Sequence, residues 1–171
     1  GFAVSIEHSQ HLRDCFLQVG IAAAHLDGET PHDERAKLLQ QLAGGQVQVL
    51  WNVGVATEGV DIPIVSCIIL ARPTMSEGLA LQMPGRGMRP YPGKSDLLIL
   101  DHAGCTMQHG FVDDEREWRL TEDRMRPAGP RIDTALTVKA CPECYRVARR
   151  DTKVCACGYV FYSATRNIHQ V

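Results

Sequence analysis

The sequence predicts an α/β protein in which a doubly wound parallel sheet is followed by a small cysteine-rich appendage. Short runs of β-branched and aliphatic residues alternate with segments whose apolar residues recur at helical spacing. This pattern is typical of strands that are buried on both faces and covered by helices. Four of the seven cysteines then crowd into residues 141–157, in a segment too short to fold around an apolar core of its own.

The helices and strands are expected in a regular order. Five apolar runs form the strands, at residues 2–6, 21–26, 47–53, 65–71 and 96–100. Apolar residues at helical spacing follow the first run as far as Gly20, which suits a helix C-terminus. Thr30 and Pro31 are expected to cap and begin a second helix that runs to about Leu42. Ser76 is expected to cap a third helix.

Composition limits the classes of protein to be considered. Of the 171 residues, 44% are apolar and 22% are charged, as in ordinary globular proteins. No apolar run approaches the ~20 residues that a membrane-spanning helix needs, so no membrane partner is expected. The opening residues have no basic lead-in and no Met, and we expect the natural protein to begin further upstream. An odd number of cysteines, four of them clustered, suits a reducing compartment, so we expect a cytoplasmic location.

The character of the chain changes near residue 112. We expect a main domain over residues 1–112, a linker or helical extension over 113–135 and the appendage over 136–163, because the periodicity fades into a charged run and a Pro- and Gly-rich stretch. Residues 1–115 hold 7 Lys and Arg against 14 Asp and Glu, whereas residues 116–171 hold 11 against 6. The basic tail would therefore attract phosphate-rich partners.

Two arginines carry the most specific chemical signal. Arg86 and Arg89 lie three residues apart, among glycines, at the expected end of the third helix. A guanidinium group pairs with two phosphate oxygens at once and keeps its proton, and an arginine from a second domain can offset charge on a transferring γ-phosphate. Because reactive loops lie at the carboxyl ends of parallel strands, we expect the pair to be aimed out of that edge. Alternatively, both are solvated residues that complement the helix dipole.

The run Q-x-x-G-R-x-x-R at residues 82–89 resembles the last signature of superfamily-two helicases. Residues 57–63, Thr-Glu-Gly-Val-Asp-Ile-Pro, resemble the signature that precedes it. Residues 71–76 resemble the strand-to-helix turn of the RadD-like branch, and residues 26–28 with Arg35 resemble the helix entry that precedes these signatures. The resemblance covers residues 1–110 and implies a RecA-like sheet of the DEAD/DEAH type. It also implies that the chain is the second motor domain of an ATP-dependent nucleic-acid helicase or translocase.

The resemblance implies roles for individual residues. Arg86 and Arg89 would be catalytic and would reach the γ-phosphate of ATP across a cleft. The nucleotide-binding positions would be Gly59, Asp61, Gln82 and Gly85. The residues nearest to a DNA or RNA backbone would be Ser5, Asn52 and Arg72. An upstream RecA-like domain would hold most of the ATP and Mg²⁺, because this sequence contains no Walker A loop and no D-E-x-[DH] strand.

Three local features depart from the family pattern or imitate another one. Pro84 stands where the family more usually has a backbone N–H, and a proline inside a helix costs about 3 kcal/mol unless the helix ends or kinks there. Val53 stands where the family commonly has a polar Thr, so that one contact to the nucleic-acid backbone would be either missing or supplied by Asn52. Gly93-Lys94-Ser95 imitates the end of a P-loop, but Met88 replaces its first glycine and a strand follows instead of a helix.

The clustered cysteines predict a zinc ribbon. Cys141 and Cys144 form a C-x-x-C knuckle, and Cys155 and Cys157 form a second close pair. Four thiolates around a tetrahedral Zn²⁺ make a closed structural site, and the RadD-like branch is similar in having a cysteine-rich tail. Because the second pair is C-x-C, a water or His169 remains an alternative fourth ligand.

Basic residues lie between the two cysteine pairs. Arg146, Arg149 and Arg150, with Lys153, are expected at a hairpin tip of the ribbon, where they would meet phosphates or only keep the ribbon soluble.

Two other functions compete with the motor-domain hypothesis. One is a non-catalytic nucleic-acid-binding or regulatory module built on the same RecA-like fold. The other is a dinucleotide or nucleotide-sugar enzyme, against which the lack of a G-x-G-x-x-G turn after the first strand argues. Under the preferred hypothesis, this chain alone is an inactive part of a larger ATP hydrolase.

Overall fold

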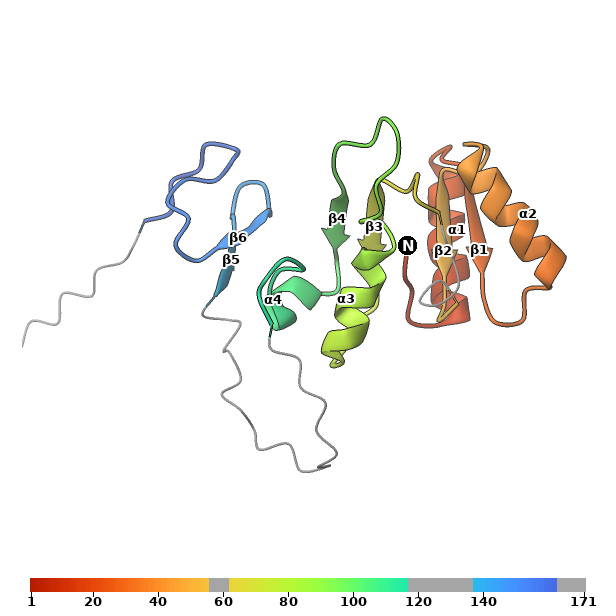
Figure 1. The fold of residues 1–171 in the computed structure, drawn as a ribbon, viewed down its shortest axis with the longest axis horizontal. Helices are drawn as coiled ribbons and strands as arrows, with labels where there is room; N and C mark the ends of the chain where they lie inside the picture. The colour runs from red at the N-terminus through yellow and green to blue at the C-terminus, as the bar shows by residue number, and fades with distance from the viewer. Residues whose placement is uncertain (56–61, 117–136, 163–171) are drawn as a thin grey trace, which may run out of the picture. The chain divides into compact units, whose positions relative to one another are not determined.

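The computed structural model describes residues 1–55, 62–116 and 137–162. The chain divides into two compact units, residues 1–105 and residues 106–171. The first unit contains α1 (Ile6–Gln18), β1 (Ala23–Leu26), α2 (His32–Ala43), β2 (Val49–Asn52), β3 (Cys67–Leu70), α3 (Glu77–Gly85) and β4 (Leu98–Asp101). The helix α4 (Cys105–His109) begins at Cys105, the last residue of the first unit. The second unit contains β5 (Val138–Ala140) and β6 (Val147–Arg149) (Figure 1).

The first unit is built on a parallel sheet. β1 pairs with β2 and β3 pairs with β4, each in parallel register. Phe2 joins the two halves, because it makes parallel bridges to Asn52 in β2 and to Leu70 in β3. The order across the sheet is therefore β1, β2, the segment of Phe2, β3, β4. A RecA-like doubly wound sheet was predicted, and this is confirmed.

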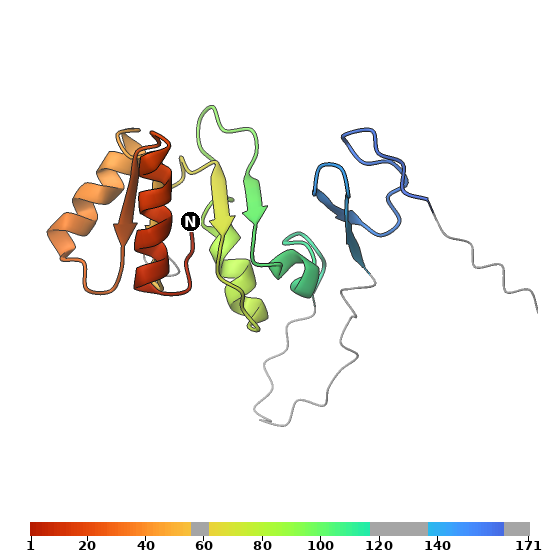
Figure 2. The same ribbon diagram turned by 180° about the vertical axis from the view of Figure 1, so that it is seen from behind.

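Helices cover both faces of this sheet. The chain steps from Phe2 across to β1 in one direction and then returns through β2, β3 and β4 in the other. Since parallel crossovers are right-handed, these opposite steps place α1 on one face and α2 and α3 on the other (Figures 1 and 2). One cluster of the core consists of Phe2, Ile68, Leu70, Met83 and Cys105. Under α1, the rings of Phe16 and Trp51 meet edge to face at 5.6 Å.

Two local predictions, the extent of the first strand and the cap of the second helix, are wrong. The strand expected at residues 2–6 contributes only the bridges of Phe2, because the Ser5 hydroxyl accepts a hydrogen bond from the His8 backbone N–H and caps α1. Thr30 does not cap α2. Its hydroxyl is hydrogen bonded to Asp27, and Pro31 occupies the N-cap position without a side-chain cap bond.

The second unit contains a short antiparallel hairpin. β5 pairs with β6 in the register Val138 to Arg149, and Val154 forms a further antiparallel bridge with Val160. The ring of Phe161 packs against Tyr159 and lies 4.0 Å below the Lys139 ammonium. Across the three described ranges of the chain, no helix has the length and apolar character needed to cross a membrane.

Candidate functional site

The arginine-bearing segment begins as the helix α3. The Ser76 hydroxyl accepts a hydrogen bond from the Leu79 N–H, 3.3 Å away, which confirms the predicted cap. Pro84 is buried and has no N–H to continue the helical ladder, so α3 ends at Gly85. The next three backbone N–H groups donate hydrogen bonds to carbonyls three residues earlier, from Arg86 to Met83, from Gly87 to Pro84 and from Met88 to Gly85. The helix was expected either to end or to kink at Pro84. It ends there, just before the two arginines.

We call residues 86–89 the arginine turn. Arg86 is the C-cap residue of α3, and the side chains of Arg86 and Arg89 are both half-buried. Because α3 runs antiparallel to the strands it connects, its end lies toward the amino ends of β3 and β4. The backbone of the arginine turn lies against Ile68 and Leu97, and the expectation that the two guanidinium groups leave the carboxyl edge of the sheet stays a prediction. α3 starts on the side of the carboxyl ends of the strands, and the chain then runs back toward their amino ends.

Gly87 brings the arginine turn against the sheet. A Cβ atom built on Gly87 would lie 2.5 Å from Leu97 Cδ1 and 2.9 Å from Ile68 Cγ1. Both distances are shorter than ordinary van der Waals contact, so a side chain would displace the turn or its neighbours. The glycine between Arg86 and Met88 is required by this close approach to β3.

The side chain of Lys94 ties the arginine turn to a second segment. Its ammonium donates hydrogen bonds to the carbonyls of Pro63, at 3.1 Å, of Arg89, at 3.0 Å, and of Gly87. Pro63 lies two residues after Asp61, within the earlier signature. The strand β4, not a helix, follows Lys94, so the strand that was predicted after residues 93–95 is confirmed. The two signature segments therefore meet at Lys94.

Some predicted nucleotide-binding residues cannot be placed. Gly59 and Asp61 lie outside the described residues. Gln82 is exposed on α3, and Gly85 is half-buried at its end. The position of Asp61 relative to the arginine turn stays a prediction, although Pro63 shows that the chain nearby reaches that turn.

A network that the sequence did not reveal organises the loop after β1. The Ser9 hydroxyl lies 2.6 Å from His25 Nδ1, and His25 Nε2 lies 2.9 Å from Asp27 Oδ2. Asp27 Oδ1 also accepts hydrogen bonds from the backbone N–H groups of Glu29 and Thr30. The bond to His25, and then those to Thr30 and Glu29, lower the pKa of the Asp27 carboxyl.

This network is structural. Its three side chains follow the order of a serine–histidine–carboxylate constellation, but Ser9 is 0% exposed, so no substrate reaches the hydroxyl. His25 was interpreted from the sequence as lacking an acid–base partner at recognisable spacing. Its partners lie 16 residues before it and 2 after it, and only the fold of α1 onto β1 brings them together.

The predicted nucleic-acid residues of the first unit occupy different environments. Ser5 caps α1, and Arg72 is half-buried just beyond β3. Asn52 is 3% exposed, and its amide donates to the Gly1 carbonyl at 2.7 Å. An amide buried between strands has no open path to a phosphate, so Asn52 supports the sheet and we leave it out of the proposed interface.

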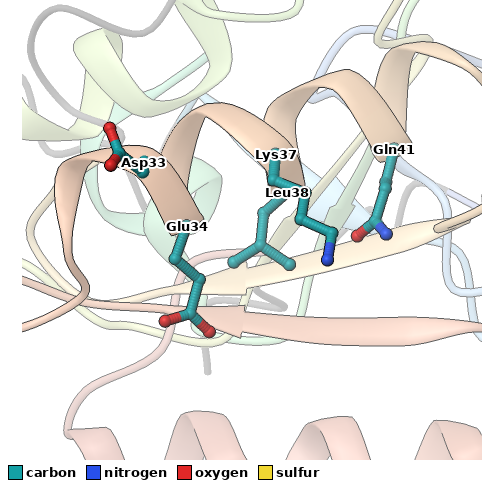
Figure 3. A pocket seen from close by; sticks show the side chains of 5 residues that line it. All are labelled: Asp33, Glu34, Lys37, Leu38 and Gln41. Carbon is teal, nitrogen blue, oxygen red and sulfur yellow. The ribbon is translucent and has the colours of Figure 1, made fainter.

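A shallow concavity of about 370 Å³ runs along α2 (Figure 3). It is lined by Asp33, Glu34, Lys37, Leu38 and Gln41, all from one helix. Two carboxylates and one ammonium suit the phosphates of a nucleotide poorly, and none of the predicted site residues is among the five.

The four clustered cysteines meet in the second unit. The sulfur atoms of Cys141, Cys144, Cys155 and Cys157 all lie within 4.8 Å of one another. The Cys141–Cys157 and Cys144–Cys155 pairs are each 3.6 Å apart. A tetrahedron with Zn–S bonds of about 2.3 Å has sulfur–sulfur edges of about 3.8 Å, so the geometry fits Zn²⁺. Both members of the C-x-C pair belong to the cluster, whereas His169 lies outside the described residues.

The local electrostatics also favour a cation among these thiols. The backbone N–H of Cys157, together with neighbouring thiols, lowers the pKa of Cys155 to about 7. The backbone N–H of Tyr159 lowers the pKa of Cys157, but the thiols of Cys144, Cys155 and Cys141, with desolvation, raise it to about 12. One thiolate therefore forms easily and a second beside it does not, until a divalent cation offsets the repulsion.

The basic residues of the second unit do not share one tip. Arg146 is exposed in the turn that holds the C-x-x-C knuckle, and Arg150 directly follows β6. Arg149 lies within β6, forms ion pairs with Asp114 and Asp113, and stacks over the Phe111 ring at 4.9 Å. The expectation of a common hairpin tip is wrong for Arg149, because β6 extends through it.

Comparison with known proteins identifies the first unit. The family model described as the helicase conserved C-terminal domain matches residues 2–91. A 51.5 kDa protein of Lactococcus phage (isolate 7-9) is 35% identical over 162 residues, which cover 94% of this chain and 35% of that protein. The Saccharomyces cerevisiae protein IRC3, described as a candidate ATP-dependent helicase, is 38% identical over 61% of this chain and 15% of its own length.

A solved structure supports the same assignment. The E. coli DEAD-box protein SrmB, solved with the regulator of ribonuclease activity A, superposes with a TM-score of 0.52. It is 28% identical, and the match covers 58% of each chain. The chain spans about a third of the phage relative and less than a sixth of the yeast relative.

Proposed function

The chain belongs to the helicase conserved C-terminal domain family, and we propose that it supplies arginine fingers to an ATP site completed by an upstream RecA-like domain. In this proposal, Arg86 and Arg89 face the γ-phosphate of ATP·Mg²⁺ held by the upstream domain, and Asp61 and Gly59 contact the nucleotide. Closure of the two domains on ATP changes their grip on a DNA or RNA strand, and hydrolysis reopens them. This chain alone neither binds ATP tightly nor hydrolyses it.

The meeting of the two signature segments carries the proposal. The signature segments 57–63 and 82–89 are separated in the sequence by β3 and the first part of α3, yet one ammonium is hydrogen bonded to Pro63 and to the arginine turn. A shared position is what a joint nucleotide site requires. Fixed guanidinium groups are effective there because they offset charge that develops in the transition state, with no reorganisation at the moment of reaction.

The second unit is proposed to hold Zn²⁺ through its four cysteines and to contact phosphates through Arg146 and Arg150. When bound, the ion would supply structural cross-linking and no chemistry, because a site closed by four thiolates has no open coordination position. Arg149 is given a structural part, because it pairs with Asp114.

The deciding experiment measures nucleic-acid-stimulated ATP hydrolysis by the full-length protein. Arg89→Ala is expected to reduce kcat by about 10³-fold or more, as loss of an arginine finger does. Arg13→Ala is the matched control, because Arg13 is an arginine of α1 that forms an ion pair with Asp14 on the same helix. If Arg89→Ala hydrolyses ATP at the wild-type rate, the chain is instead a non-catalytic nucleic-acid-binding module.

A further inference from the structure

We propose that Lys94 is a positioning residue that holds the arginine turn in the geometry needed for ATP hydrolysis. The inference rests on the proposed function, because it assigns Lys94 a role only through Arg86 and Arg89. Nothing in the resemblance to helicases assigned this lysine a role. In the sequence, Lys94 stands out only because Gly93-Lys94-Ser95 resembles the end of a P-loop.

The hydrogen bonds of Lys94 define its role. An ammonium group has three N–H donors and no acceptor, and here the three carbonyls of Pro63, Gly87 and Arg89 receive them. With its donors used in this way, the ammonium has none left for a phosphate. It acts as a cross-link between backbone segments, and the carbonyls of Gly87 and Arg89 lie beyond the end of α3, where they have no helical partner.

These bonds fix the backbone on both sides of Met88. The carbonyl of Gly87 belongs to the peptide plane before Met88, and the carbonyl of Arg89 belongs to the plane after Arg89, so Lys94 holds the planes on both sides of the Met88–Arg89 pair. The third bond sets this segment against Pro63, two residues from Asp61. Lys94 therefore determines where the Cα of Arg89 lies relative to the earlier signature.

The local fold delivers the lysine to this place. Gly93 has φ of +81°, a left-handed conformation that suits glycine, and the Lys94 N–H donates to the Tyr91 carbonyl at 3.0 Å. This tight turn reverses the chain after Pro90, so that the side chain of Lys94 reaches back to the arginine turn. Gly93 therefore serves the turn, and Lys94 serves the cross-link to the arginine turn.

The test is Lys94→Met in the full-length protein, with Lys37→Met as the control. Methionine keeps most of the side-chain length and removes the donors, while Lys37 is an exposed lysine of α2. We expect kcat for nucleic-acid-stimulated ATP hydrolysis to fall about 10²-fold, as a misplacement of about 1 Å does. KM for ATP should change by less than about threefold, because most ground-state binding belongs to the upstream domain. Lys37→Met should match the wild type.

Coupling to Arg89 separates positioning from general stability. Residues that act as one unit are not additive, so Lys94→Met should cause no further loss of kcat in an Arg89→Ala background. Lys94→Gln, which keeps two amide donors, should give an intermediate kcat. Rates are expressed per folded molecule, with folding measured by circular dichroism at the assay temperature.

Each outcome decides one point. Wild-type kcat in Lys94→Met overturns the positioning role while leaving the arginine fingers intact. A loss in Lys94→Met that adds fully to that of Arg89→Ala shows a merely structural role and also overturns it. Wild-type activity in Arg89→Ala overturns the proposed function itself.

Discussion

At the scale of single residues, the arginine turn depends on a glycine that carries no chemistry. Gly87→Ala places a Cβ atom 2.5 Å from Leu97 and 2.9 Å from Ile68, so we expect the substitution to cost about 1–3 kcal/mol of unfolding free energy. Gly78→Ala is the matched control within α3, because its nearest contact is 3.9 Å away. Alanine there should be neutral or stabilising by up to about 1 kcal/mol. Thermal denaturation of the 171-residue chain measures both, and equal melting temperatures would refute the close approach.

The same scale shows what the sequence could not reveal. Ser76, Pro84 and the paired arginines were recognisable because their effects are local and depend on one or a few neighbouring residues. The network of Ser9, His25 and Asp27 was missed, because a fully buried hydroxyl on α1 has no sequence signal that points to a histidine in β1. Long-range hydrogen bonds of this kind follow from packing, not from spacing.

At the scale of elements, the alternation of strands and helices was predictable and their ends were not. All five apolar runs supply sheet residues, but each strand is shorter than its run, and the first is reduced to the bridges of Phe2. Capping bonds set these ends. Ser5 caps α1 and so ends the first extended segment. The Thr30 hydroxyl, which was expected to cap α2, is hydrogen bonded to Asp27 instead. Apolar runs report burial, and burial extends beyond the paired backbone.

The cysteine cluster makes a prediction about the second unit. The purified chain should contain one Zn²⁺, and Cys157→Ser should lower both zinc content and zinc affinity, because all four sulfur atoms lie within 4.8 Å of one another. Cys15→Ser, in α1 and outside the cluster, should keep full zinc content. Metal analysis after dialysis against a chelator measures the difference. Full, tight zinc binding by Cys157→Ser would mean that another residue, such as His169, is the fourth ligand.

At the scale of the whole molecule, the acidic main domain and basic tail seen in the sequence belong largely to different units. An acidic first unit suits a motor domain whose partner holds the triphosphate, while the basic residues 116–171 of the second unit attract a nucleic-acid backbone. The sequence predicted this division by charge, but it did not show which basic residues are already engaged. Arg149 is committed to Asp114 and Asp113, whereas Arg146 is exposed in the knuckle turn.

That difference predicts how salt acts on binding. For a single strand, every phosphate that a cationic side chain neutralises adds about 0.7 to the steepness of log K against log salt. Arg146→Ala should therefore weaken binding of the 171-residue chain to a single-stranded oligonucleotide and flatten the slope by about that amount. Arg149→Ala should leave the slope nearly unchanged, because its guanidinium pairs with carboxylates of its own unit. Fluorescence anisotropy over a series of salt concentrations compares the two. If Arg149→Ala flattens the slope and Arg146→Ala does not, the ion pair with Asp114 opens on binding and the proposed interface lies on β6.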